Sequence, residues 1–106
     1  MFVIIFEVIP HASQKDRYFE LAAQLRETLV KQPGFLQIER FQSLVDEGKI
    51  LSLSSWESEE AIAAWRHQAD HMLAQKEGKE KTFDSYRLRV VQVVREYSFS
   101  SAPDNN

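Results

Sequence analysis

The sequence predicts an α+β fold of ferredoxin-like type, in which one antiparallel sheet carries both helices on a single face. Two observations support this fold class. The apolar segments follow the order strand, helix, strand, strand, helix, strand, and both helical segments are amphipathic. A βαββαβ order of this kind folds most simply into a single sheet with its helices on one side.

The first strand is expected over residues 2–9, where β-branched and aromatic residues run up to Pro10. A helix should follow, because Ser13 and Asp16 have the spacing of a capping box and apolar residues then recur every three or four positions. Those apolar residues are Tyr18, Leu21, Ala22, Leu25 and Leu29. The segment 32–34, Gln-Pro-Gly, ends this helix.

The middle of the chain predicts two strands, over residues 35–44 and 49–56, which pair antiparallel. The turn between them contains Gly48, which can adopt the positive φ that a short hairpin demands. A second helix begins after Ser58 as its N-cap and ends near Gly78, with an apolar stripe of Ile62, Trp65, Ala69, Met72 and Leu73. The last strand is expected over residues 87–99.

Size and composition indicate one domain over residues 1–99, followed by a disordered polar tail over residues 100–106. A net charge of −3 with scattered basic residues argues against nucleic acid as a partner, and no apolar run is long enough for a membrane helix. The chain has no cysteine, which excludes disulfides and thiolate metal sites. The first residues lack the charged region of a secretory signal, so we expect a cytoplasmic protein.

The first strand is apolar on both sides, which has a consequence for assembly. Phe2, Ile4, Phe6 and Val8 lie on one side, whereas Val3, Ile5 and Ile9 lie on the other. Two helices cover only one face of a sheet, and monomers rarely expose a large apolar patch. We therefore expect a homodimer in which the sheets of two copies face each other.

Three segments carry a resemblance to a known family. They are Pro33-Gly34-Phe35, the stretch Ser55-Trp56-Glu57-Ser58-Glu59-Glu60-Ala61, and Trp65 within the second helix. Together they resemble the antibiotic biosynthesis monooxygenase (ABM) domain family of dimeric α+β barrels, over nearly the whole chain. The resemblance implies one of several activities, since the family includes cofactor-independent oxygenases that convert aromatic polyketides to quinones, haem-degrading enzymes, proteins acting on quinols, and domains without a known role.

The haem-degrading branch of that family places an Asn on the first strand, a Trp in the second helix and a His ten residues later. The matching positions in this chain hold Glu7, Trp65 and Gln75. Glutamine is a poor substitute for an imidazole that must coordinate iron, so haem degradation is disfavoured. The resemblance leaves Trp65 and Gln75 as candidate pocket residues, with no resident cofactor and no metal expected.

Glu7 interrupts an otherwise apolar strand, and two interpretations are open. A carboxylate desolvated there would have a raised pKa, which suits a general base that deprotonates a phenol or quinol. Alternatively, Glu7 forms a structural ion pair with Arg87, Arg89 or Arg95 of the last strand.

Histidine and tryptophan residues supply the remaining candidates. Trp65 either shapes a cavity for an aromatic ligand or is an ordinary core residue, and Trp56 is expected to be structural. His67 and His71 share one helix face, a weak metal signal. In a continuous helix both would point to solvent, whereas a kink near residues 66–70 would turn His71 toward a cleft as an acid or base.

Two functions are therefore expected as alternatives. The first is a monooxygenase or quinol oxidase without a prosthetic group, which acts on a small electron-rich aromatic molecule with Glu7 or His71 as base and Trp65 as cavity wall. The second is a non-enzymatic dimeric domain that binds a ligand or responds to stress. An enzyme should have a cleft with a polar group of shifted pKa, whereas the second alternative should show Glu7 locked to an arginine and helices packed flush on the sheet.

Overall fold

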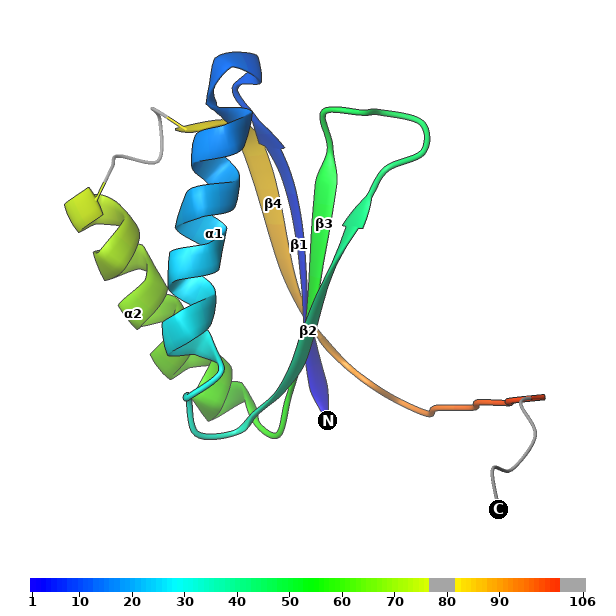
Figure 1. Ribbon diagram of the computed structural model, residues 1–106. Coiled ribbons are helices and arrows are strands. Elements are labelled where there is room, and N and C mark those ends of the chain that lie inside the picture. Colours follow the sequence, from blue (N-terminus) through cyan, green and yellow to red (C-terminus); the bar gives the residue numbers. More distant parts are fainter. Residues whose placement is uncertain (77–81, 102–106) are drawn as a thin grey trace.

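The computed structural model describes residues 1–76 and 82–101, which form one sheet and two long helices (Figure 1). The elements are β1 (Phe2–Pro10), a short 3-10 helix (Ala12–Gln14), α1 (Lys15–Leu29), β2 (Phe35–Gln42), β3 (Ile50–Trp56), α2 (Glu59–Lys76) and β4 (Phe83–Gln92). The strands lie in the order β2-β3-β1-β4 and every neighbouring pair is antiparallel. The predicted ferredoxin-like α+β fold is confirmed.

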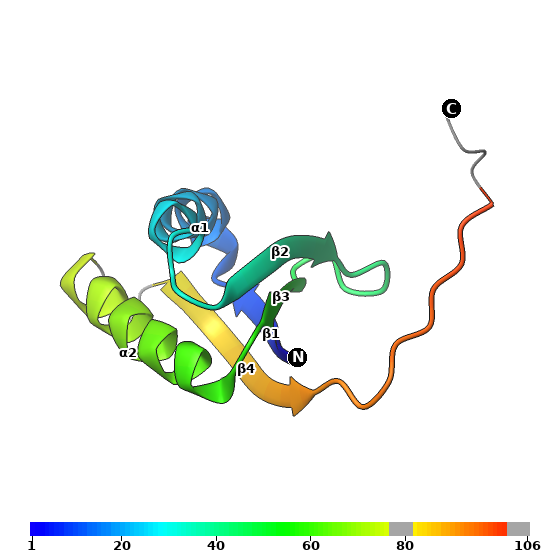
Figure 2. The same cartoon turned by 90° about the horizontal axis from the view of Figure 1, so that it is seen from below.

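Both helices lie on the same side of the sheet, and the other side has no covering element among the described residues (Figures 1 and 2). The pairing register defines the two faces. Ile4 of β1 lies opposite Ser54 and Val90, and these positions face the helices; Ile5 lies opposite Leu53 and Arg89, which face the other way. We call the second side the open face; its apolar residues are Val3, Ile5, Ile9, Phe41, Leu51, Leu53 and Val91.

The last strand differs from its prediction at both ends. It begins at Phe83, because that segment pairs with the end of β1 at Pro10, and it stops at Gln92, which lies opposite Phe2. Beyond Phe2 the partner strand ends, and one more hydrogen bond, from the Val93 N–H to the Met1 carbonyl (3.0 Å), closes the ladder. The predicted extension of this strand to Phe99 is therefore wrong, and residues 93–101 lead away from the sheet (Figure 1).

Helix starts confirm one predicted cap and correct another. The Ala61 N–H donates to Ser58 Oγ (3.1 Å), so Ser58 caps α2 as expected. Ser13 lies instead within the 3-10 turn before α1, whose N-cap is Gln14 without a side-chain hydrogen bond, and the predicted capping box is wrong. The predicted end of the second helix near Gly78 and tail residues 102–106 lie outside the described residues.

The glycine that needs a positive φ is Gly34 and not Gly48. Gly34 has φ +83°, and a Cβ there would approach the Ala61 Cβ to 2.8 Å. Its carbonyl also accepts the Glu57 N–H (2.8 Å), so the turn after α1 is bonded to the turn that leads into α2. In the β2–β3 loop, the carboxylate of Asp46 shapes the turn by accepting the Gly48 N–H (3.0 Å).

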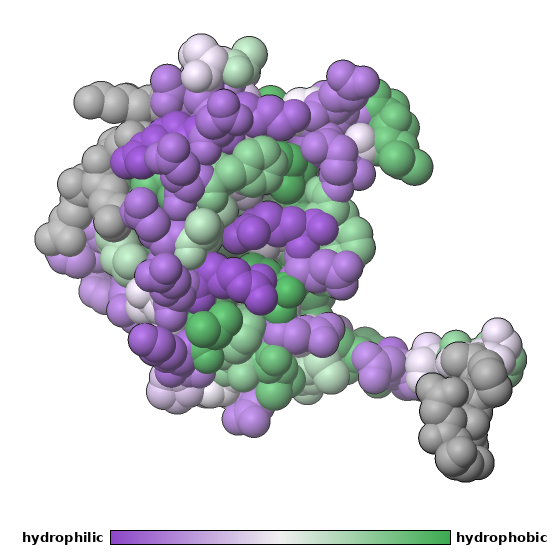
Figure 3. Space-filling model, viewed as in Figure 1, coloured by the Kyte–Doolittle hydropathy of each residue, from purple (hydrophilic) through white to green (hydrophobic). Residues whose placement is uncertain are grey.

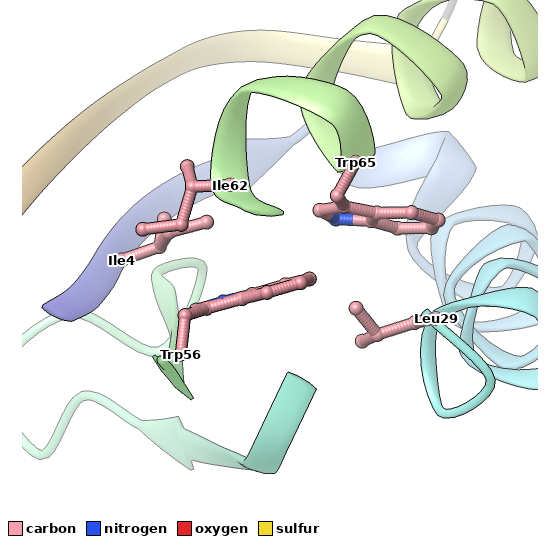
Figure 4. Packing of buried hydrophobic residues seen from close by; sticks show 5 residues of the cluster. All are labelled: Ile4, Leu29, Trp56, Ile62 and Trp65. Atoms are coloured by element: carbon pink, nitrogen blue, oxygen red, sulfur yellow. The ribbon is translucent and has the colours of Figure 1, made fainter. Parts of the chain in front are cut away.

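The core lies between the helices and the sheet. Its largest cluster joins Ile4, Leu29, Trp56, Ile62 and Trp65 (Figure 4). Trp56 is fully buried, and its indole N–H donates to Ser54 Oγ (2.9 Å), which confirms its predicted structural role. Within the described residues, no helix has both the length and the apolar character needed to cross a membrane.

Candidate functional site

The candidate site is a cleft of about 190 Å³ enclosed by α1, α2 and the helix-facing side of the sheet. All four strands contribute to its floor. The two helices form its walls, and the apolar lining comes mainly from Ile4, Phe6, Leu21, Leu25, Leu29, Ile38, Trp65, Leu73, Phe83 and Leu88. The non-enzymatic alternative required helices that pack flush against the sheet, and the cleft shows that they do not.

Trp65 belongs to both the core and the cleft. Its side chain is 9% exposed and packs with Ile4 and Ile62 in the core cluster, and it also lines the cleft. Figure 4 shows its ring lying above that of Trp56. The two interpretations of Trp65 are thus compatible, because one indole can pack against the core and still present an edge to a ligand.

Polar groups that the sequence prediction missed lie inside the cleft. Tyr18 of α1 is 5% exposed, and burial raises the pKa of its hydroxyl, while the nearby Arg40 guanidinium offsets part of that rise. Arg40 of β2 is half-buried and donates to the Ala22 carbonyl of α1 (3.3 Å). Ser52, opposite Arg40 in the sheet, adds a hydroxyl to the floor. Tyr18 therefore remains protonated at neutral pH, and its hydroxyl has a proton to donate to a ligand.

Charged residues gather where the cleft meets solvent. Arg26 of α1 and Arg66 and Asp70 of α2 line the cleft and are exposed. Asp70 is the one carboxylate among the described lining residues. A general base that works inside the cleft is therefore best sought at Asp70, a residue that the sequence analysis did not name as a candidate.

Glu7 lies on the open face, away from the cleft. Its carboxylate accepts from Arg87 Nη2 at 2.8 Å and lies 3.4 Å from Lys49 Nζ. The hydrogen bond from Arg87 lowers the pKa of Glu7, and the contribution of Lys49 together with that bond outweighs the opposing effect of burial. The predicted raised pKa of Glu7 is wrong, and the alternative ion pair with Arg87 is confirmed. The catalytic role that rested on the raised pKa stays an untested prediction without that support.

The histidines lie on the solvent side of α2. This helix is continuous from Glu59 to Lys76, so the kink that would have turned His71 inward is not observed. His67 and His71 are both exposed, and neither lines the cleft. Across residues 1–76 and 82–101, no three His, Asp or Glu side chains group as a metal site. The side chain of Gln75, the remaining predicted pocket residue, lies outside the described part of the chain.

Comparisons with known proteins agree with this architecture. The chain is 43% identical over 94 residues to a protein of Pyricularia oryzae named jasmonate monooxygenase ABM; the match covers 89% of this chain but only 44% of that longer protein. It is also 32% identical over 99 residues to the uncharacterised protein YqjZ of Bacillus subtilis, covering 92% of this chain and 83% of the relative.

Solved structures share the fold at lower sequence identity. The structure of Rv0793 from Mycobacterium tuberculosis matches with a TM-score of 0.77 and 14% identity, covering 92% of this chain and 98% of that one. The family model described as antibiotic biosynthesis monooxygenase matches residues 1–86. This match, which spans β1 to β3, both helices and the first residues of β4, shows that the chain belongs to the antibiotic biosynthesis monooxygenase family.

Proposed function

We propose that this chain is a monooxygenase domain that oxidises a small electron-rich aromatic molecule within the cleft, without a prosthetic group. The observation that carries the proposal is the enclosed apolar space at Trp65. Its volume of about 190 Å³ is somewhat larger than the roughly 150 Å³ cavity that is known to hold a benzene molecule. A body of one or two rings therefore fits between the helices and the sheet.

The proposed chemistry needs a base, a dry site and oxygen. Removal of a proton from an electron-rich CH₂ or phenol gives an anion that can pass electrons to O₂ directly. For a CH₂ group, one oxygen atom becomes the new carbonyl oxygen and the other leaves as water, so that the substrate supplies all the electrons. For a quinol, two electrons and two protons pass to O₂, giving quinone and hydrogen peroxide.

Asp70 and Tyr18 are the groups of this chain that we assign to proton handling. The Asp70 carboxylate lines the cleft from α2 and is placed to accept the substrate proton. The buried Tyr18 hydroxyl, kept protonated, donates a hydrogen bond to oxygen atoms that gain negative charge. The name of the relative from Pyricularia oryzae supports oxygenation of a small organic molecule, and that relative matches over most of this chain.

Oxygen consumption with a panel of hydroquinones and anthrones tests the proposal. We expect wild-type turnover and a fall in kcat of about 10²–10⁴ in Asp70→Asn, the range typical of a lost general base. Glu7→Gln and His71→Ala are matched controls, because both remove an ionisable group that does not line the cleft. A larger loss in Glu7→Gln than in Asp70→Asn would return the base to Glu7. Inactivity of wild type across the panel would contradict the proposal.

A second candidate function is a ligand-binding domain without catalysis. The observation that favours it is the Glu7–Arg87 ion pair, which removes from Glu7 the character expected of a base. The cleft and the shifted Tyr18 hydroxyl favour the enzyme instead. Binding of aromatic molecules without oxygen uptake would decide for this second function.

We also propose that two copies of the chain associate through the open face. Phe41 and Val91 are 43% and 36% exposed on that face, and Val3, Ile5 and Leu53 beside them are half-buried. A second sheet laid against these side chains would remove a continuous apolar surface from water, which is the usual basis of a stable homodimer. Sedimentation at micromolar concentration measures whether the chain is a monomer or a dimer.

A further inference from the structure

We propose that the cleft takes a molecule with a carboxylate group, which Arg40 binds from the floor while the apolar body lies against Trp65. The inference deepens the proposed function, on which it rests for the presence of a substrate, by naming the chemical class of that substrate. Its starting point is the position of Arg40, a charged residue on the helix-facing side of a sheet whose floor is otherwise apolar or carries small hydroxyls.

Arg40 has no acidic partner in the described part of the chain. No carboxylate oxygen of residues 1–76 or 82–101 lies within 4 Å of its guanidinium nitrogens. This differs from Glu7 on the open face, which has two cationic partners. A half-buried cation without a counter-ion is costly unless something else compensates it, so Arg40 is poised to receive an anion.

The guanidinium group of Arg40 also has N–H groups left to donate to a ligand. It carries five N–H groups, of which one donates to the Ala22 carbonyl and another interacts with the Tyr18 hydroxyl, so that others remain for a ligand. The planar fork of arginine matches the two oxygens of a carboxylate and binds them with paired hydrogen bonds. Ser52, opposite Arg40 on β3, and Tyr18, on α1, supply neutral donors on either side.

The remaining lining suits the rest of such a molecule. Apolar residues of both helices and of β1 surround the space beyond Arg40, and the described lining residues include three arginines but one carboxylate. The excess of positive charge favours entry of an anion over entry of a cation. The fitting ligand is thus an amphipathic acid with one ring-sized apolar body and one carboxylate.

Binding of a matched acid and ester tests this inference without relying on turnover. The probes are 3-phenylpropanoate and its methyl ester, which share the ring and chain but differ in charge. Titration of the full chain, followed by calorimetry and by tryptophan fluorescence, gives both dissociation constants. We expect wild type to bind the acid at least about tenfold more tightly than the ester, a difference of one charge-assisted contact.

Substitutions identify the residues that make the protein bind the acid more tightly than the ester. Arg40→Gln should bring the acid-to-ester ratio close to one without changing ester affinity, and Arg40→Lys should keep part of the preference because it keeps the charge but loses the fork. Tyr18→Phe should reduce the ratio a few-fold. Arg89→Gln, the same substitution on the open face, should leave it unchanged. Thermal unfolding of each variant separates a lost contact from a lost fold, and Arg40→Lys carries the test if Arg40→Gln does not fold.

Equal binding of acid and ester by wild type, binding of neither, or a ratio unchanged in both Arg40 variants would overturn the inference. Its failure is distinguishable from failure of the proposed function. Acid binding that depends on Arg40 but is never followed by oxygen uptake would contradict the monooxygenase and support the carboxylate site. Turnover of neutral aromatics by a protein that binds acid and ester equally would support the monooxygenase and contradict the carboxylate site.

Discussion

The two faces of the sheet are built from the same strands but treat charge in opposite ways. On the open face, Glu7 is held by Arg87 of β4 and by Lys49, which directly precedes β3. On the helix-facing side, Arg40 reaches a backbone carbonyl and a tyrosine hydroxyl but no carboxylate of the described chain. A compensated charge is part of the scaffold, whereas an uncompensated one next to a cavity is available to a ligand.

The faces also differ in packing. On β1, Val8 is fully buried and Ile4 is 5% exposed beneath the helices, while their neighbours Val3 and Ile5 on the open face are only half-buried. The helix-facing side therefore forms a buried core around the cleft, whereas the open face leaves apolar side chains partly exposed at the proposed dimer interface. Substitutions on each side should separate these two roles.

The largest expected effect is loss of stability in the core cluster on the helix-facing side. Trp56→Ala removes a fully buried indole and should lower the free energy of unfolding by about 3–5 kcal/mol, because a large cavity remains. Urea denaturation measures the change. Trp56→Phe keeps an aromatic ring and loses mainly the hydrogen bond to Ser54, so its cost should be clearly smaller. A loss below about 1 kcal/mol in the alanine variant would contradict the core assignment.

On the open face, a charge should affect assembly more than folding. Leu53→Lys places an ammonium in the centre of the proposed interface and should weaken the dimer at least about tenfold, while circular dichroism stays native. Sedimentation equilibrium gives the dissociation constant. Ala63→Lys, on the exposed side of α2, is the matched control and should leave assembly unchanged. A wild-type protein that sediments as a single protomer at micromolar concentration would refute the interface.

A smaller effect is expected in the acid range from Glu7. Its pKa is lowered in the folded protein, so the ion pair stabilises the fold fully above the unfolded-state pKa of about 4.5. As pH falls below that value the unfolded chain takes up a proton first, and the contribution is lost as pH falls through the folded-state pKa. Urea denaturation at a series of pH values should therefore show a steeper acid decline in wild type than in Glu7→Gln. Parallel curves for the two proteins would show that the ion pair is not coupled to folding.

The smallest effect is expected at the β2–β3 loop, whose projecting tip is coloured as hydrophobic in Figure 3. Leu44 and Val45 of this loop are 99% and 98% exposed. Leu44→Ser should change the free energy of unfolding by no more than about 0.5 kcal/mol. Ser43→Ala is the informative contrast, because Ser43 Oγ accepts the N–H groups of Val45 (3.2 Å) and Asp46 (3.0 Å). Its cost should be about 1 kcal/mol in the same denaturation assay. A reversed order would mean that the apolar loop residues contact something beyond this protomer.

Sequence patterns were sufficient for the fold and for one wall of the cleft. The alternation along β1 separates the two faces correctly, and the helical spacing places Trp65 on the side that meets the sheet. The strand end at Gln92 was not predictable in this way. It depends on where the partner strand begins, and the apolar residues that follow have the same β propensity as those before it.

The polar residues of the cleft could not be predicted from the sequence, for a related reason. Tyr18 and Arg40 are 22 positions apart and belong to a helix and an edge strand, so their proximity follows only from how α1 crosses β2. One signal was available, since Arg40 has the same parity in its strand as the inward-facing Ile38. Glu7 could not be decided from sequence, because its pKa depends on which cations the register places beside it.

The bond between Gly34 and Glu57 has a mechanical consequence for the two helices. It joins the turn after the C-terminal end of α1 to the turn before the N-terminal end of α2, at a place where a side chain on Gly34 would clash with Ala61. Any widening between the helices would then be smallest at this bond and larger toward the N-terminal half of α1 and the C-terminal half of α2, which carry Tyr18 and Asp70. A guest molecule would therefore come and go past the very groups that we assign to handling its protons.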